Sequence, residues 1–172
     1  MIDAQTIDRV LSGIIASEGG FVNDPVDHGG ATNYGITLNT LRAQADYEGS
    51  TIDTLKSLDV SVAKQIYTQH YIKPYVILSN PIVFSLCVNG AVQHGVSGMN
   101  KIIQSALGVS PDGILGKTSQ GKLLCNEASP TQFLAALVAG RLNYYASIIH
   151  KHPEQIKFAC GWMRRVGRDI TL

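Results

Sequence analysis

Glu18, Asp27 and Thr32 lie within one short stretch of the chain, and their side chains suit acid–base chemistry. Apolar residues repeat at helical spacing before Glu18, which predicts an amphipathic helix over residues 3–17. Gly19 and Gly20 follow and supply the positive-φ cap that ends such a helix. We therefore expect Glu18 at the helix C-terminus, where the negative end of the helix dipole disfavours a carboxylate anion. A glutamic acid held protonated there could act as a general acid.

A second carboxylate follows Glu18 at a spacing that suits glycoside hydrolysis, which usually needs one on either side of the scissile bond. Asp27 lies nine residues after Glu18. Turn residues at 23–25 and 28–30 flank short segments and predict a hairpin that returns over Glu18. Asp24 is an alternative to Asp27, but an aspartate before proline more often bonds its own backbone. We therefore favour Asp27.

The stretch from Glu18 to Thr37 carries Glu-Gly-Gly, Asn-Asp-Pro, Asp-His-Gly-Gly-Ala-Thr and Tyr-Gly-Ile-Thr in one uninterrupted segment. It resembles the signature of the glycoside hydrolase family 108 muramidases, endolysin-like enzymes that cut bacterial peptidoglycan. The order Glu, Asp, Thr is also similar to that of phage-type lysozymes. The resemblance implies a lysozyme-like fold, with Glu18 as the acid and with Asp27 and Thr32 orienting the attacking water. It implies neither a metal nor a cofactor.

A second resemblance lies in the C-terminal half, in Ile-Gln-Ser-Ala-Leu-Gly-Val at 103–109 and in Asp-Gly-Ile-Leu-Gly from Asp112. These residues, with Thr118, look like the peptidoglycan-binding module that is paired with this muramidase family. The alternative is structural, because the glycines make a turn and Asp112 and Thr118 can cap a following helix. The two resemblances imply a catalytic lobe at 1–88 and a peptidoglycan-binding lobe at 89–172, packed as one compact unit.

The segments between the two resemblances read as short helices. Thr37 can cap a helix that begins at Leu38, and either Asp59 or Ser61 can cap another. Pro74 follows and is expected to end that second helix.

The remaining segments predict longer helices. Pro81 to Gln93 is apolar nearly all round, as in a helix buried on most sides. Another amphipathic stripe covers residues 99–107, and Pro130 and Pro153 each stand at a first-turn position. The sequence therefore predicts a mainly α fold, a helical bundle with a small β-hairpin beside Glu18.

Aromatic and amide side chains suit the apolar faces and polar edges of sugars. Tyr34 directly follows the predicted hairpin, and Gln93 stands near the end of a buried helix, where its amide needs a partner. At helical spacing such residues can equally be ordinary packing. The candidates for lining a glycan cleft are Tyr34, Asn89, Gln93, Tyr144, Tyr145 and Trp162.

Charge and composition limit the possible partners. Residues 1–88 carry five lysines and arginines against nine aspartates and glutamates, and residues 89–172 carry nine against four. No nucleic-acid motif accompanies the basic half, the histidines and cysteines form no metal-ligand pattern, and no apolar run is long enough to insert in a membrane. We expect a monomer that binds peptidoglycan glycan strands.

The N-terminus lacks the basic and apolar regions of a signal peptide. We therefore expect synthesis in the cytoplasm and dependence on a holin or another export route to reach peptidoglycan in the periplasm or cell wall.

Together these patterns predict a muramidase that hydrolyses the β-1,4 bond between N-acetylmuramic acid and N-acetylglucosamine. Two alternatives remain open. A lytic transglycosylase would use a single acid/base carboxylate and no water, and a non-catalytic wall-binding or secretion-adaptor protein would release no products.

Overall fold

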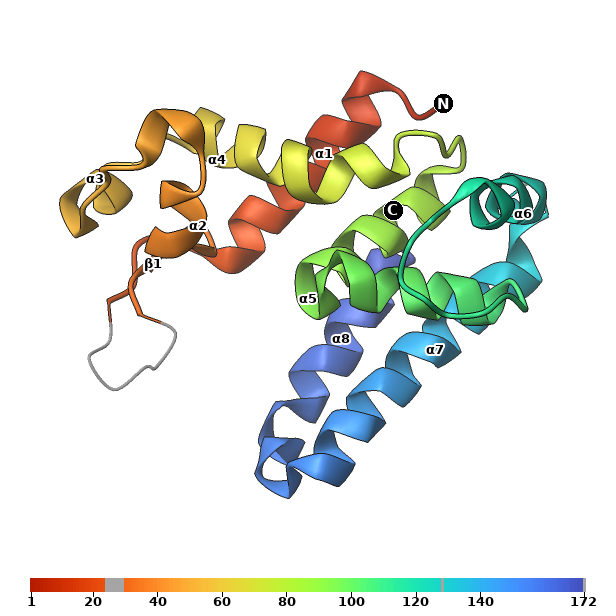
Figure 1. The fold of residues 1–172 in the computed structure, drawn as a ribbon. Coiled ribbons are helices and arrows are strands. Elements are labelled where there is room, and N and C mark those ends of the chain that lie inside the picture. Colours follow the sequence, from red (N-terminus) through yellow and green to blue (C-terminus); the bar gives the residue numbers. More distant parts are fainter. Residues whose placement is uncertain (24–29, 128, 172) are drawn as a thin grey trace. The chain divides into compact units, whose positions relative to one another are not determined.

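A computed structural model describes residues 1–23, 30–127 and 129–171, and in these residues the chain is mainly helical with one small two-stranded sheet (Figure 1). The chain divides into two compact units. The smaller unit is Asp8–Gln69, and the larger joins Met1–Ile7 to His70–Leu172.

Helices and one hairpin build the smaller unit. Thr37 caps α2 by accepting a hydrogen bond of 3.1 Å from the backbone N–H of Thr40, and Asp59, rather than Ser61, caps α4. The capping predictions at Thr37 and Asp59 are confirmed. α3 has no counterpart among the sequence-based predictions. The elements are α1 (Ala4–Glu18), β1 (Thr32–Asn33), β2 (Ile36–Thr37), α2 (Leu38–Arg42), η1 (Ala45–Tyr47), α3 (Ile52–Lys56) and α4 (Val60–Tyr67).

The apolar stripe of α1 is buried, as its periodicity predicts. Each of the short helices α2 and α3 buries one leucine completely, Leu41 and Leu55. Short helices of this kind are stabilised by tertiary packing more than by their own propensity. The buried apolar side chains of this unit are Val10, Leu11, Ile14, Ile15, Ala31, Ile36, Leu41, Leu55, Leu58, Ala63, Ile66 and Tyr67.

The larger unit is a helical bundle. A π-helical turn follows α4 directly and passes into a 3₁₀ turn that contains Pro74. The regular α-helix thus ends before Pro74, and the chain remains helical through these two turns. Pro130 opens a long helix and Pro153 a 3₁₀ segment before the last helix. The elements are η2 (Thr68–Ile72), η3 (Lys73–Tyr75), α5 (Pro81–Ala106), α6 (Lys117–Glu127), α7 (Pro130–Lys151), η4 (Pro153–Phe158) and α8 (Ala159–Asp169).

α5 is the central helix of this bundle and packs against α7. It joins two segments that the sequence predicts as separate helices, with a kink at Gly95 where φ is 73° and ψ is 155°. A Cβ on Gly140 of α7 would lie 2.6 Å from the Ile102 side chain, so the glycine lets the two helices approach closely. The predicted lobe boundary between residues 88 and 89 falls within α5. The division into lobes stays a prediction.

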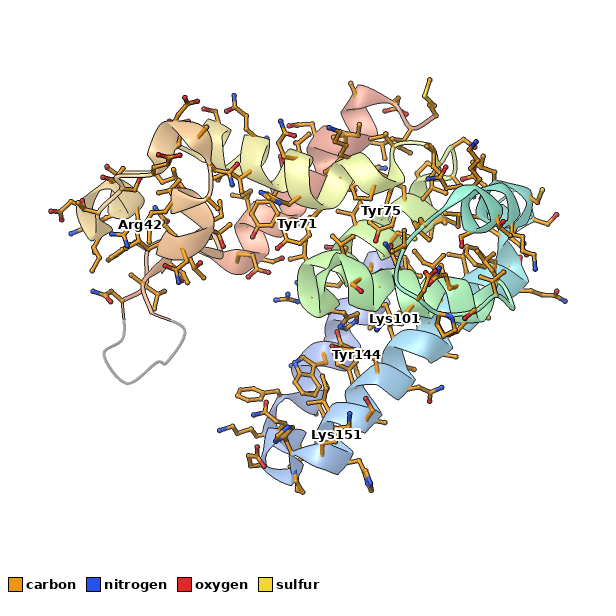
Figure 2. The ribbon with its side chains drawn as sticks, viewed as in Figure 1. Arg42, Tyr71, Tyr75, Lys101, Tyr144 and Lys151 are labelled. Atoms are coloured by element: carbon orange, nitrogen blue, oxygen red, sulfur yellow. The ribbon has the colours of Figure 1, made fainter. Side chains whose placement is uncertain are left out.

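The loop between α5 and α6 is held by amide side chains of α5. The Gln104 amide donates to Asp112 at 2.7 Å and to the Ile114 carbonyl at 2.9 Å, and its oxygen accepts from the Gly113 N–H at 2.8 Å. The Asn100 amide, which also accepts from the Tyr75 hydroxyl (labelled in Figure 2), donates to the Gly113 carbonyl. Asp112 thus has a structural role in this turn. Among the described residues, none of the helices has the length and apolar character that a bilayer crossing requires.

Candidate active site

Glu18 is the last residue of α1, as the sequence predicts, and its side chain is half-buried. Gly19 follows with a φ of +78°, a conformation that ends helices and that residues with a Cβ rarely adopt. The glutamate therefore stands where the regular backbone stops, at the helix end closest to the following loop.

The hairpin that follows has a tight two-residue turn. Thr32 pairs with Thr37 and Asn33 with Ile36, so Tyr34 and Gly35 form the turn, with φ values of 52° and 73°. Positive φ at both central positions is the type I′ geometry, whose twist matches that of the flanking strands. Tyr34 has the one positive φ among the described residues other than glycine. Such a conformation costs free energy, and cases of it cluster at functional sites.

Gly35 brings this turn against the catalytic candidate. A Cβ on Gly35 would lie 3.0 Å from Cγ and 3.0 Å from Oε2 of Glu18, and 2.7 Å from the Tyr67 hydroxyl oxygen. Only a residue without a side chain leaves room for both groups at this point. The absent Cβ thus lets the Glu18 carboxyl group and the Tyr67 hydroxyl lie over the same backbone position.

Two hydrogen bonds fix the hairpin beside Glu18. The Tyr67 hydroxyl, from α4, donates to the Tyr34 carbonyl at 2.9 Å. The buried amide of Asn33 donates to the Leu55 carbonyl at 2.9 Å and to the Lys56 carbonyl at 3.2 Å, at the end of α3. These carbonyls belong to the last turn of α3, where the regular helical hydrogen bonds run out, so the amide adds a partner for each and ties the strand to α3. The Leu55 carbonyl also accepts from the Leu58 N–H at 3.2 Å.

Thr32 lies on the same hairpin. Its backbone pairs with Val22 on its other side through two hydrogen bonds of 2.8 Å. The turns predicted at 23–25 and 28–30 lie mostly outside the described residues, and Tyr34, predicted to follow the hairpin, forms the turn of the observed one. Asp27, predicted as the second carboxylate, and Asp24, its alternative, lie outside the described residues. The structure thus places Glu18, Thr32 and Tyr34 in one unit, around one turn.

The other predicted glycan ligands belong to the larger unit. Their polar groups form hydrogen bonds with other residues of that unit. The Asn89 amide donates to the Ser85 carbonyl at 3.0 Å. The Gln93 amide oxygen accepts from Arg141 at 2.9 Å and from the Tyr145 hydroxyl. Their roles as glycan ligands stay predictions.

Arg141 is the centre of this polar cluster. Its side chain is completely buried and forms an ion pair of 2.6 Å with Asp169 of α8, whose own side chain is 7 % exposed. A buried charge needs such a partner because its desolvation is costly. The ring of His94 packs against Tyr144 (labelled in Figure 2) at 4.4 Å between centroids. Burial, with the nearby Arg141 charge, lowers the pKa of His94 to about 4.

The described residues contain no group of three His, Cys, Asp or Glu side chains placed to hold a metal ion. Among the residues that the structure describes, the groups at the hairpin with suitable chemistry are the Glu18 carboxyl group, Tyr34, Tyr67 and Thr32. This set suits proton transfer and hydrogen bonding to a polar substrate.

The chain matches two protein families. Residues 11–95 match the glycosyl hydrolase 108 family, and residues 99–167 match the family described as a predicted peptidoglycan domain. The chain carries a glycosyl hydrolase 108 domain. The first match contains the whole hairpin and Glu18. The pairing of the two domains identifies a glycosidase that acts on peptidoglycan.

The solved structure of SagA from Brucella abortus is similar over nearly the whole length. The two chains are 27 % identical, the match covers 98 % of this chain and 94 % of that chain, and the TM-score is 0.80. The expectation of a mainly helical, lysozyme-like fold with a small β element is confirmed. No functionally curated protein matches the chain in sequence.

Sequence reasoning missed two residues beside Glu18, Tyr67 and Gly35, and one at the centre of the polar cluster in the larger unit, Arg141. Tyr67 reads only as part of an apolar helical stripe, and Gly35 as one more turn glycine. Arg141 reads as an ordinary solvated charge. Its complete burial could have been suspected from Leu137 and Tyr145, four residues before and after it on the same helix face, because an arginine inside an apolar stripe needs a buried partner.

Proposed function

We propose that the glycosyl hydrolase 108 domain is a muramidase that hydrolyses the β-1,4 bond between N-acetylmuramic acid and N-acetylglucosamine, with Glu18 as its general acid. The observation that carries the proposal is the position of Glu18 against the Gly35 turn, at the end of α1 and inside the region that matches the family. The peptidoglycan domain at 99–167 supports the choice of substrate.

In this proposal, the Glu18 carboxyl group donates its proton to the glycosidic oxygen as the bond from that oxygen to the anomeric carbon breaks. Asp27 and Thr32 orient a water molecule on the opposite face of the sugar. The water oxygen bonds to the anomeric carbon, and its proton passes to Asp27. We expect the Glu18 and Asp27 carboxyl groups to lie about 6.5–9.5 Å apart, which leaves room for that water and inverts the anomeric carbon.

The glycan itself would contact the rigid hairpin as well as Glu18. Tyr34 is half-exposed, and the hydrogen bond from Tyr67 to its carbonyl fixes its backbone. Its ring is therefore available to pack on the apolar face of a sugar. Asn89, Gln93 and Tyr145 are proposed as further glycan contacts. Hydrogen bonds hold all three side chains, that of Asn89 to Ser85 and those of Gln93 and Tyr145 within the Arg141 cluster.

Digestion of purified sacculi, followed by mass spectrometry of the soluble products, tests the proposal. We expect muropeptides with reducing N-acetylmuramic acid ends, and NMR should show the α-anomer as the first product. Glu18→Gln keeps the shape of the side chain and removes its acid, so the rate should fall ~10²–10⁴-fold or more. Glu48→Gln, at an exposed glutamate of the same unit, is the matched control and should leave the rate unchanged.

Each alternative gives a different result. Anhydro-muropeptides would identify a lytic transglycosylase instead, because that reaction closes the sugar ring on itself without water. A folded native protein that binds sacculi and releases no products would be a wall-binding or adaptor protein. Near-native activity in folded Glu18→Gln protein would reject Glu18 as the acid.

A further inference from the structure

The larger unit exposes an apolar surface between its last two long helices. α7 and α8 run side by side (Figure 1), and an open groove of about 450 Å³ lies between them. On its rim Leu142, Met163 and Ile170 are 38, 57 and 38 % exposed, while Tyr145 and Val166 form its buried floor. Exposed apolar surface of this kind usually marks a binding site.

The apolar surface continues beyond the groove onto η4. Trp162 lines the groove, and its ring lies 6.1 Å from that of Phe158 between centroids. Phe158 is 46 % exposed and Ile156, also in η4, is 60 % exposed. The surface therefore combines a concave part between the helices with side chains that protrude past its end.

Basic residues border this surface. Arg164 and Arg168 line a second hollow on α8 that shares Gly167 with the groove. The Lys157 ammonium lies 5.0 Å from the centre of the Phe158 ring. Lys151 stands at the end of α7, as Figure 2 shows.

Acidic side chains do little to offset these charges. Residues 138–171 are all described and contain two acidic residues, Glu154 and Asp169. Asp169 is buried and paired with Arg141, so Glu154 is the one acidic side chain exposed in this stretch. The border of the apolar surface therefore carries a net positive charge.

We propose that the face formed by α7, η4 and α8 docks on an anionic lipid surface. Lysine and arginine attract anionic headgroups, and apolar side chains between them enter the boundary of the acyl chains, which is how amphipathic helices lie on membranes. The parts of the acyl chains nearest the headgroups can fill the groove, while Ile156 and Phe158 enter the same layer. Tyr145 is the one proposed glycan contact that also lines the groove, and it lies at the buried floor. The docking face includes no residue of the hairpin, so binding to vesicles and cleavage of sacculi can fail separately.

Charge and shape favour this occupant over two others. A second copy of the chain would present the same positive charge, and like charges across an interface are costly. A partner helix lying in the groove would leave Ile156 and Phe158 exposed beyond its end. A lipid surface covers both the groove and the protruding side chains and meets the basic border with phosphate.

Sedimentation with vesicles tests the proposal on the full chain. Vesicles of equimolar phosphatidylglycerol and phosphatidylcholine should bind the protein, and vesicles of phosphatidylcholine alone should not. Trp162 is the one tryptophan of the chain and lines the groove, so its fluorescence should shift to shorter wavelength on binding. Added salt should weaken the binding, because it screens the charges.

Paired variants separate the two contributions. Arg164→Gln with Arg168→Gln should weaken binding about tenfold or more, and so should Met163→Glu. The matched controls lie on α6, where Lys117→Gln with Lys122→Gln removes the same charge and Leu124→Glu alters another exposed apolar side chain. They should change binding less than about twofold. Circular dichroism verifies that each variant is folded.

Three results would overturn the proposal. The first is no binding of the native protein to phosphatidylglycerol vesicles, or equal binding to both kinds of vesicle. The second is that folded Met163→Glu binds the vesicles as tightly as the native protein, which would mean that charge attraction alone accounts for the binding. The third is an equal loss of binding in the α6 controls, which would place the contact elsewhere.

Discussion

The hydroxyl of Tyr67 donates a hydrogen bond of 2.9 Å to the carbonyl oxygen of Tyr34, across 33 residues of chain. This bond joins α4 to the tightest turn of the hairpin. It holds Tyr34 at a φ of 52°, which the residue would not readily adopt by itself. Because the next residue is Gly35, the same bond keeps the turn beside the Glu18 carboxyl group. Helix α4 thus positions a site to which it contributes no acid.

We expect Gly35→Ala to impair both folding and activity. The new methyl group would lie 2.7 Å from the Tyr67 hydroxyl oxygen and 3.0 Å from the Glu18 side chain, at a φ of +73°. The free energy of unfolding should fall by about 1–3 kcal/mol, and cleavage of sacculi by about tenfold or more, because Glu18 must move. Urea denaturation and product release measure the two effects.

Gly49→Ala is the control for that variant. It lies in the same unit with no atom near its Cβ position and should be close to neutral. Native activity in Gly35→Ala would show that contact between the turn and Glu18 is not needed.

Two ion pairs among the described residues, Arg141–Asp169 and Lys64–Asp8, should differ widely in their contribution to the free energy of unfolding. Asp169→Ala leaves Arg141 charged and completely buried, so the free energy of unfolding should fall by about 3–5 kcal/mol. Asp8→Ala removes a pair of similar length, 2.7 Å to Lys64, but Asp8 is 68 % exposed, so the loss should stay below about 1 kcal/mol. Equal losses in urea denaturation would contradict this assignment.

Acid should destabilise the larger unit through His94. Burial, with the charge of Arg141, lowers the pKa of His94 from 6.5 to about 4, so between these values the unfolded chain binds more protons than the folded one. The contribution of His94 to stability is therefore complete above pH 6.5 and is lost as the pH falls toward 4, by at most about 1.4 kcal/mol per pH unit. Urea denaturation at several pH values measures the slope.

The matched variant for this slope is His94→Gln. It keeps a polar side chain beside Arg141 and cannot titrate in this range. Its stability should therefore change less between pH 6.5 and 4 than that of the native protein. Parallel curves for the two proteins would assign the acid sensitivity to other groups.

A fragment of residues 1–88 should neither fold stably nor cut peptidoglycan. It would end within α5 and leave Val83, Phe84 and Leu86, which are completely buried, without α7. Exposure of these side chains should cause aggregation. Analytical size-exclusion chromatography and a sacculus digest would detect the opposite result, a soluble and active fragment, which would show that the lobe at 1–88 is independent.

Local signals account for the elements that could be predicted. The ends of helices depend on neighbours within a few residues, so Thr37, Asp59, Gly19 and Pro130 marked their helices correctly. The kink at Gly95 was not predicted, because a glycine within an apolar stripe is also compatible with two separate helices.

The chain's sequence by itself determined the helical class, the position of Glu18 at a helix end and the resemblance of residues 18–37 to a muramidase signature. These depend on residue type and short spacing. Tertiary structure alone decided that Tyr67 and Gly35 meet at Glu18 and that Arg141 is paired with Asp169 inside the protein. The physical reason is that such contacts join residues far apart in the chain, and their free energy depends on burial and distance, which no local pattern contains.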